Sequence, residues 1–159
     1  MSLKLDISPA CRSALQSQGW SEERTADVSE VLAVLEPIGY SFDDRAKCVM
    51  RSLLGISVDP VISDGVFPND EPLIVDPIGV GRRGFSESMS LQDRFGSSFT
   101  PLGWWLCRSH VFFASAGLVV ASLPGVVWHL GDSLDEAIDF MLLAHRPLVR
   151  LVSADGLED

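Results

Sequence analysis

The stretch RSHVFFASAGLVVASLPGVVWHLGD, residues 108–132, decides the fold of this chain. Between Arg108 and Asp132 it carries no Asp, Glu, Lys or Arg. This uncharged stretch is long enough to span a bilayer. However, Gly117 and Pro124-Gly125 divide it into pieces of strand length that are rich in Val and Phe. We therefore predict buried antiparallel strands in this stretch and no membrane helix.

The residues on either side of this stretch extend the same pattern. Turn residues separate four apolar segments, which predicts an antiparallel meander of strands at 102–107, 110–115, 118–123 and 126–130. A capping box follows, because Glu136 stands three residues after Ser133. It predicts a last helix with its apolar side turned inward, ending near residues 145–147.

The first third of the chain predicts three helices. Ser8-Pro9 is typical of a helix start and Gly19 of a stop. A second helix is expected after Ser21, with apolar residues at helical spacing from Val28 to Leu35, and a third between Ser41 and Gly55.

The middle of the chain predicts irregular structure with two short strands, 56–58 and 73–75. Turns are expected at 63–65 and 68–70. Residues 79–98 are rich in Gly and Ser, and we expect a loop there with one helical turn around 91–95. The acidic tail, residues 153–159, is expected to fray.

Helices followed by strands and a closing helix are typical of an α+β fold. We predict a single domain over residues 1–159, with N-terminal helices, an antiparallel sheet meander and a C-terminal helix packed on the sheet. The apolar fraction of 47% is typical of a globular chain.

The net charge and the cysteine spacing limit the functions that this chain can have. A net charge of −10 repels nucleic acid and anionic lipid and attracts a basic protein, although it also simply keeps a domain soluble. The three cysteines have no metal-ligand spacing, so we expect buried free thiols and no metal site. Residues 1–9 lack the apolar region of a signal peptide, and a cytoplasmic location is expected.

Three patterns resemble reactive sites. Residues 79–84 match GxGxxG, but no βαβ unit surrounds them, so we interpret them as a flexible glycine loop with two arginines. Cys107 and His110 could form a thiol–imidazole pair, yet a spacing of three on a strand places them on opposite faces. His129 and Asp132 are expected to stay apart, with the acid directed to solvent.

Other residues favour partner binding. Asp135, Glu136 and Asp139 form an acidic cluster on the expected exposed side of the last helix. This cluster is either a solvated helix start or a docking patch for a basic partner. The adjacent Trp104 and Trp105 must face opposite sides of a strand, so one leaves the core unless a helix covers that side as well. An exposed tryptophan is a frequent anchor of protein interfaces.

Several short motifs in order resemble a known family. They are Gly19-Trp20 with Arg24 and Asp27, Leu35 with Gly39, the 46–55 helix with its glycine, residues 99–103 (FTPLG), and residues 131–138 (GDSLDEAI). Over roughly residues 19–147 the chain is similar to the third subgroup of the SUKH superfamily, the immunity proteins of bacterial polymorphic toxin systems. The resemblance implies a SUKH-like α+β fold, binding of a cognate nuclease or nucleic-acid deaminase toxin, no cofactor and no catalytic residues.

The leading hypothesis is therefore an immunity protein that neutralises a basic toxin by stoichiometric binding and contacts no nucleic acid or membrane. A regulatory or scaffold module of the same fold is the first alternative. The second is a small cytosolic enzyme that uses Cys107 or His110.

Overall fold

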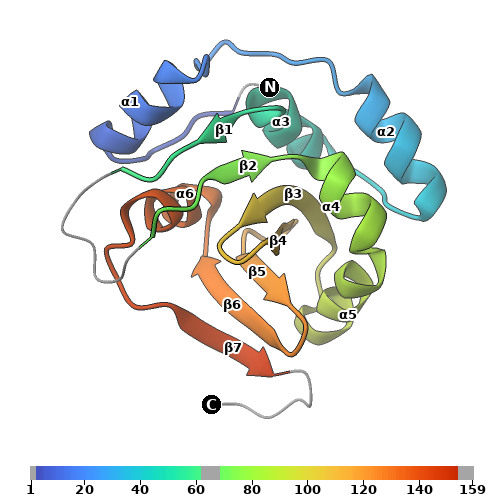
Figure 1. The fold of residues 1–159 in the computed structure, drawn as a ribbon. Helices are drawn as coiled ribbons and strands as arrows, with labels where there is room; N and C mark the ends of the chain where they lie inside the picture. The colour runs from blue at the N-terminus through green and yellow to red at the C-terminus, as the bar shows by residue number, and fades with distance from the viewer. Residues whose placement is uncertain (1–2, 62–68, 154–159) are drawn as a thin grey trace.

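The computed structural model describes residues 3–61 and 69–153 and has an α+β fold (Figure 1). Helices precede a seven-stranded antiparallel sheet whose strands lie side by side in chain order, β1 to β7. The predicted fold class and meander are confirmed. The turn expected at 63–65 and the tail after Ser153 lie outside the described residues, as does the first residue of the turn at 68–70.

The three N-terminal helices are confirmed: α1 (Pro9–Ser17), α2 (Ser29–Leu35) and α3 (Asp44–Leu53), with a 3-10 turn, η1 (Glu36–Ile38), after α2. The side chain of Ser8 caps α1 by accepting the backbone N–H of Cys11, and Asp43 caps α3 in the same way. The α2 helix begins later than the sequence suggested. Asp27 accepts the N–H of Ser29 at 2.9 Å and marks its start.

The linker between α1 and α2 is tied to the end of α3 by two side chains. The indole N–H of Trp20 donates to the buried Ser52 hydroxyl at 2.9 Å. The guanidinium of Arg24 donates to the carbonyls of Ser52 and Leu54 at 2.7 and 2.6 Å. Carbonyls at the C-terminal end of a helix lack backbone N–H donors within the helix. Arg24 supplies donors to two of them and therefore stabilises the end of α3.

Six strands of the described sheet were broadly expected from the sequence, and one was not. Its strands are β1 (Ser57–Val58), β2 (Leu73–Val75), β3 (Phe99–Trp105), β4 (Ser109–Ala114), β5 (Val119–Leu123), β6 (Val126–Gly131) and β7 (Val149–Ser153). The last strand, β7, pairs with β6 and was not predicted.

The prediction of a loop over residues 79–98 is wrong. Two helices occupy this segment, α4 (Pro77–Arg83) and α5 (Phe85–Phe95). Asp76 accepts the N–H of Gly79 at 3.0 Å and Pro77 stands at the first helical position, so the segment does contain a helix start. Gly96, in the left-handed conformation at φ 69°, ends α5.

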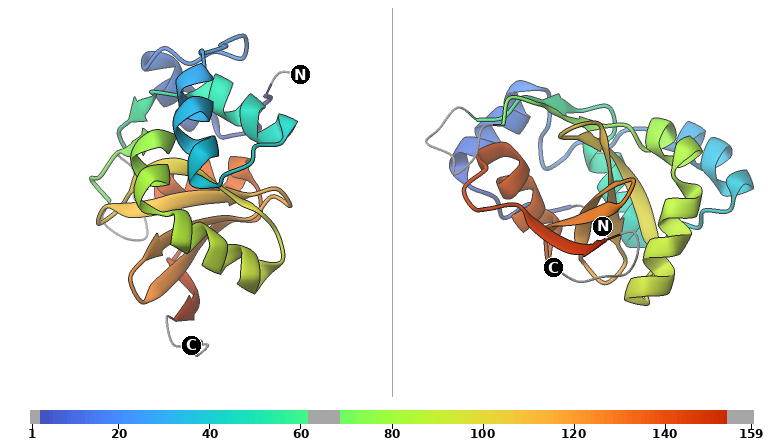
Figure 2. Two further views of the ribbon diagram at one scale, coloured as in Figure 1. Left: turned by 90° about the vertical axis from the view of Figure 1, so that its right-hand side faces the viewer. Right: turned by 60° about the horizontal axis from the view of Figure 1, so that its bottom comes forward.

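Helices cover both faces of the sheet (Figure 2). The closing helix α6 (Leu134–Leu143) packs on one face, with Phe113 and Leu130 in the larger core. Helices α4 and α5 lie against the opposite face, where Val80 and Leu91 pack on Phe112. None of the described helices combines the length and the apolar character that crossing a bilayer requires.

Candidate functional site

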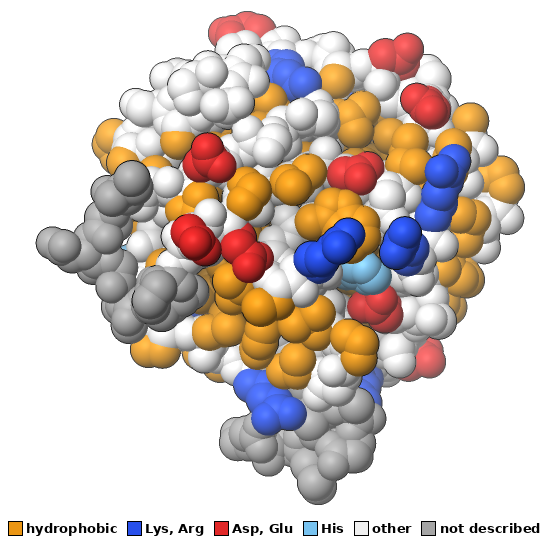
Figure 3. Space-filling model, viewed as in Figure 1, with side chains coloured by type: hydrophobic (Ala, Val, Ile, Leu, Met, Phe, Trp, Pro, Cys, Tyr) orange, Lys and Arg blue, Asp and Glu red, His pale blue; other side chains and the backbone are white. Residues whose placement is uncertain are grey.

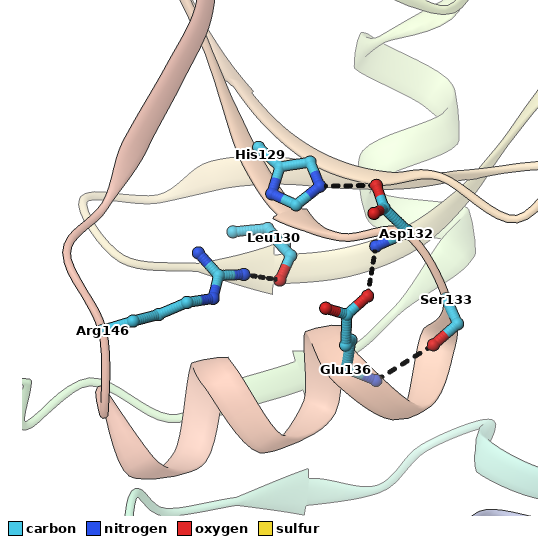
Figure 4. Close-up of polar contacts among 6 residues, drawn as sticks. All are labelled: His129, Leu130, Asp132, Ser133, Glu136 and Arg146. Carbon is cyan, nitrogen blue, oxygen red and sulfur yellow. Dashed lines mark hydrogen bonds and ion pairs between the residues drawn. The ribbon is translucent and has the colours of Figure 1, made fainter.

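The start of α6 is built as the sequence predicted (Figure 4). The Ser133 hydroxyl accepts the N–H of Glu136 at 3.2 Å. In return, Oε2 of Glu136 accepts the N–H of Asp132 at 2.8 Å, one residue before the capping serine. Glu136 and Asp132 remain exposed, so they present carboxylates to solvent at this end of the helix.

The other two acids of the predicted cluster do not form an exposed patch. Asp139 accepts the backbone N–H of Ser8, with Oδ1 at 3.0 Å and Oδ2 at 3.3 Å. Asp135 accepts the backbone N–H of Asp6, and burial raises the pKa of its carboxyl. Both side chains are half-buried beneath the N-terminal segment. Expecting all three acids on an open surface was therefore wrong for Asp135 and Asp139.

The two adjacent tryptophans face opposite sides of β3, as predicted. Trp105 is only 1% exposed and packs on Phe140 of α6, with ring centroids 5.8 Å apart. Its indole is thus unavailable as an interface anchor, which corrects that part of the prediction. Trp104 lies on the side of α4 and α5 and stays partly exposed, and its indole N–H donates to Oδ2 of Asp76 at 3.2 Å.

Trp104 belongs to a line of side chains that crosses the sheet. Residues that stand directly opposite each other on neighbouring antiparallel strands share one face, and the strand pairing aligns five of them in this way. We call them the cross-strand row: Ile74, Trp104, His110, Ser122 and Val127. The row is open at one end, where Ile74 is 40% exposed, and covered in the middle, where Ser122 is 6% exposed.

Side chains from α4 and α5 hold the row in place. Glu87 of α5 contacts Nδ1 of His110 through Oε1 at 2.7 Å. The His110 ring in turn meets Trp104 edge to face, with centroids 5.0 Å apart. Because Asp76 accepts the indole N–H, contacts on two sides orient the Trp104 ring. Fixed aromatic side chains lose little conformational entropy on binding.

A groove of about 390 Å³ continues the row between α5 and the β5–β6 hairpin. Its walls combine serines and charged residues of α5 with apolar residues of the hairpin: Ser86, Glu87, Ser90, Leu91, Leu123 and Val126. The groove and the open end of the row lie on the same face of the sheet. Together they form the candidate site.

Cys107 and His110 do not make a reactive pair in this arrangement. Cys107 stands in the turn between β3 and β4, where it is exposed, so the expectation of a buried thiol is wrong for this residue. Its N–H donates to Oε2 of Glu71 at 2.6 Å. The ring of His110 contacts Trp104, Phe112 and Glu87.

Asp132 is exposed to solvent, as predicted, but its carboxylate contacts His129, which was not expected. Nε2 of His129 lies 2.9 Å from Oδ1 of Asp132 (Figure 4). Nearby, the guanidinium of Arg146 donates to the carbonyl of Leu130 and stacks 3.9 Å above the Phe140 ring. These contacts connect the end of β6 with α6 and with the residues that follow it.

The GxGxxG glycines serve packing and helix capping. A Cβ at Gly81 would lie 2.6 Å from Leu35 and one at Gly84 would lie 2.9 Å from Phe112. A Cβ at Gly79 would collide with the capping carboxylate of Asp76 at 2.2 Å. The expected flexible loop is therefore a helix that needs small residues for close approach.

Sequence reasoning missed Ile74, Asp76 and Glu87. Alternation within β2 leaves Ile74 exposed between two buried residues, but three apolar residues in a row do not reveal which one faces outward.

Within the described residues, no three His, Cys, Asp or Glu side chains gather as metal ligands would. Comparison with family models, curated proteins and solved structures gives no match to this chain.

Proposed function

We propose that this chain is an immunity protein that binds a basic cognate toxin and neutralises it by stoichiometric contact. The observation that carries the proposal is a pre-positioned, partly exposed Trp104 beside the 40% exposed Ile74, on a chain of net charge −10. Tryptophan in a partly apolar patch is typical of interface hot spots. The resemblance to the SUKH immunity proteins supports the same function.

The negative net charge of the chain favours a partner with a positive net charge. With 22 acidic and 12 basic residues, the chain attracts a basic protein over distances set by the ionic strength. Exposed carboxylates lie on α3 at Asp44 and in loops at Asp59 and Asp70, so they are spread over the surface and not confined to one patch. We expect the association rate to fall as salt is added, and the dissociation rate to change less.

Protection of cells tests the proposal. The protein encoded by the neighbouring open reading frame is expressed with and without this chain, and growth is measured. We expect growth to stop without the chain and to be restored with it. Growth arrest that persists at high levels of the chain contradicts the proposal. Binding of a host protein together with no protection favours the scaffold module.

A further inference from the structure

The open end of the cross-strand row has the composition of a protein interface. Ile74 and Trp104 supply an apolar centre, and the carboxylates of Asp76 and Glu87 contact Trp104 and its neighbour His110. The neighbouring helix α4 ends in two exposed arginines, Arg82 and Arg83. Figure 3 shows hydrophobic side chains reaching the surface beside a histidine, between acidic and basic side chains. An apolar centre with a charged rim is the usual anatomy of a specific interface.

The carboxylates of this rim have capacity left for a partner. Oε1 of Glu87 contacts His110, and no described donor contacts its Oε2. Asp76 accepts one bond at each oxygen, from Gly79 and Trp104, and each oxygen of a carboxylate can accept two. A Lys or Arg side chain that approaches Trp104 would therefore meet two carboxylates and an aromatic ring, a setting that favours cations.

We propose that the toxin of the preceding section binds at this open end. An apolar side chain of the toxin packs on Ile74 and Trp104, and a basic side chain faces Asp76 and Glu87. The inference rests on the proposed function and adds the surface and the contacts that perform it.

A second copy of the chain is a weaker occupant of the same surface. Two copies of net charge −10 repel each other. A basic partner does not carry this net repulsion.

Two matched isoleucines test the proposal. Ile74 is 40% exposed and Ile38, on η1, is 37% exposed, so Ile74→Glu and Ile38→Glu make the same change at equal exposure. The toxin from the neighbouring gene, in an inactive form, is titrated with each variant by calorimetry. We expect Ile74→Glu to weaken binding at least tenfold and Ile38→Glu to change it less than twofold. Circular dichroism melting checks that both variants are folded.

Trp104→Phe provides a second readout, since it keeps a ring but removes the donor to Asp76. We expect a loss of at least threefold with an unchanged fold. If the wild type binds and both Ile74→Glu and Trp104→Phe bind equally well, the surface is wrong while the proposed function stands. If the wild type does not bind, both fall. If Ile74→Glu instead converts a dimer to a monomer, the surface is a self-interface and the proposal is overturned.

Discussion

Asp139, in the second turn of α6, accepts the backbone N–H of Ser8 with both carboxylate oxygens, at 3.0 and 3.3 Å. The two residues are 131 positions apart in the chain. This contact joins the N-terminal segment to the closing helix, and Asp135 repeats it one turn earlier with the N–H of Asp6. Asp139 and Asp135 thus both face the N-terminal segment, and Glu136 alone of the three acids is exposed.

Removing the acceptor of Ser8 is expected to destabilise the protein. Asp139→Ala leaves the partly buried N–H of Ser8 without its charged partner, which costs about 1–3 kcal/mol of unfolding free energy. Asp139→Asn keeps one acceptor and should recover part of the loss. The measurement is urea unfolding, with the exposed Asp93→Ala as the control that changes stability by less than about 0.5 kcal/mol. An Asp139→Ala protein as stable as the wild type contradicts the contact.

Asp135 is expected to make the protein less stable as the pH rises through the titration range of its carboxyl. An acid in an ion pair has the opposite effect. Burial raises its pKa above the ordinary 3.8, so the fold disfavours the ionised form. The penalty is absent below pH 3.8 and becomes complete once the pH exceeds the raised value. Asp135→Asn keeps an acceptor for Asp6 without the charge. It should be more stable than the wild type at pH 7 and equally stable at pH 3, by denaturant unfolding at each pH. A variant less stable at pH 7 would refute this assignment.

The three thiols are expected to react at very different rates. Cys107 is exposed, whereas Cys11 and Cys48 are buried. Burial also raises the pKa of Cys11 to about 11, so its thiol stays protonated at pH 8. A chromogenic disulfide reagent at pH 8 should titrate one thiol rapidly in the native protein and three after unfolding. Cys107→Ser should abolish the rapid phase; two rapid thiols would show that the core is more open than described.

The bond between Trp20 and Ser52 can be measured by a double-mutant cycle. Trp20→Phe removes the indole N–H and leaves the buried Ser52 hydroxyl without its donor, in addition to the loss of packing. In a Ser52→Ala background, Trp20→Phe should reduce the free energy of unfolding by about 1 kcal/mol less than it does in the wild type. Unfolding free energies of the four proteins give the coupling. A coupling of zero means that the bond does not contribute to stability.

Local signals made the outer helices and the meander predictable. Caps such as Ser8 and Ser133 and the alternation of apolar strands with turn residues act over a few residues, so a sequence displays them directly. Helix α4 was missed because Gly79 and Gly81 lower helix propensity. The packing of Gly81 on Leu35 overrides that propensity, and such a contact between distant segments leaves no local pattern.

The candidate site was predicted only in part, for a similar reason. Opposite orientation of Trp104 and Trp105 follows from the geometry of any strand. Which of them is covered depends on α4, α5 and α6, and so on the whole fold. The roles of Asp135 and Asp139 depend on backbone donors of the distant N-terminal segment, which helix periodicity does not reveal.

The proposed neutralisation can be measured by titrating the activity of the toxin with this chain. A fixed amount of the protein from the neighbouring gene is assayed for its activity while this chain is added in increasing amounts. Neutralisation by tight contact predicts that activity falls linearly and vanishes at one equivalent. Full activity that persists in the presence of a large excess of the chain would contradict the account.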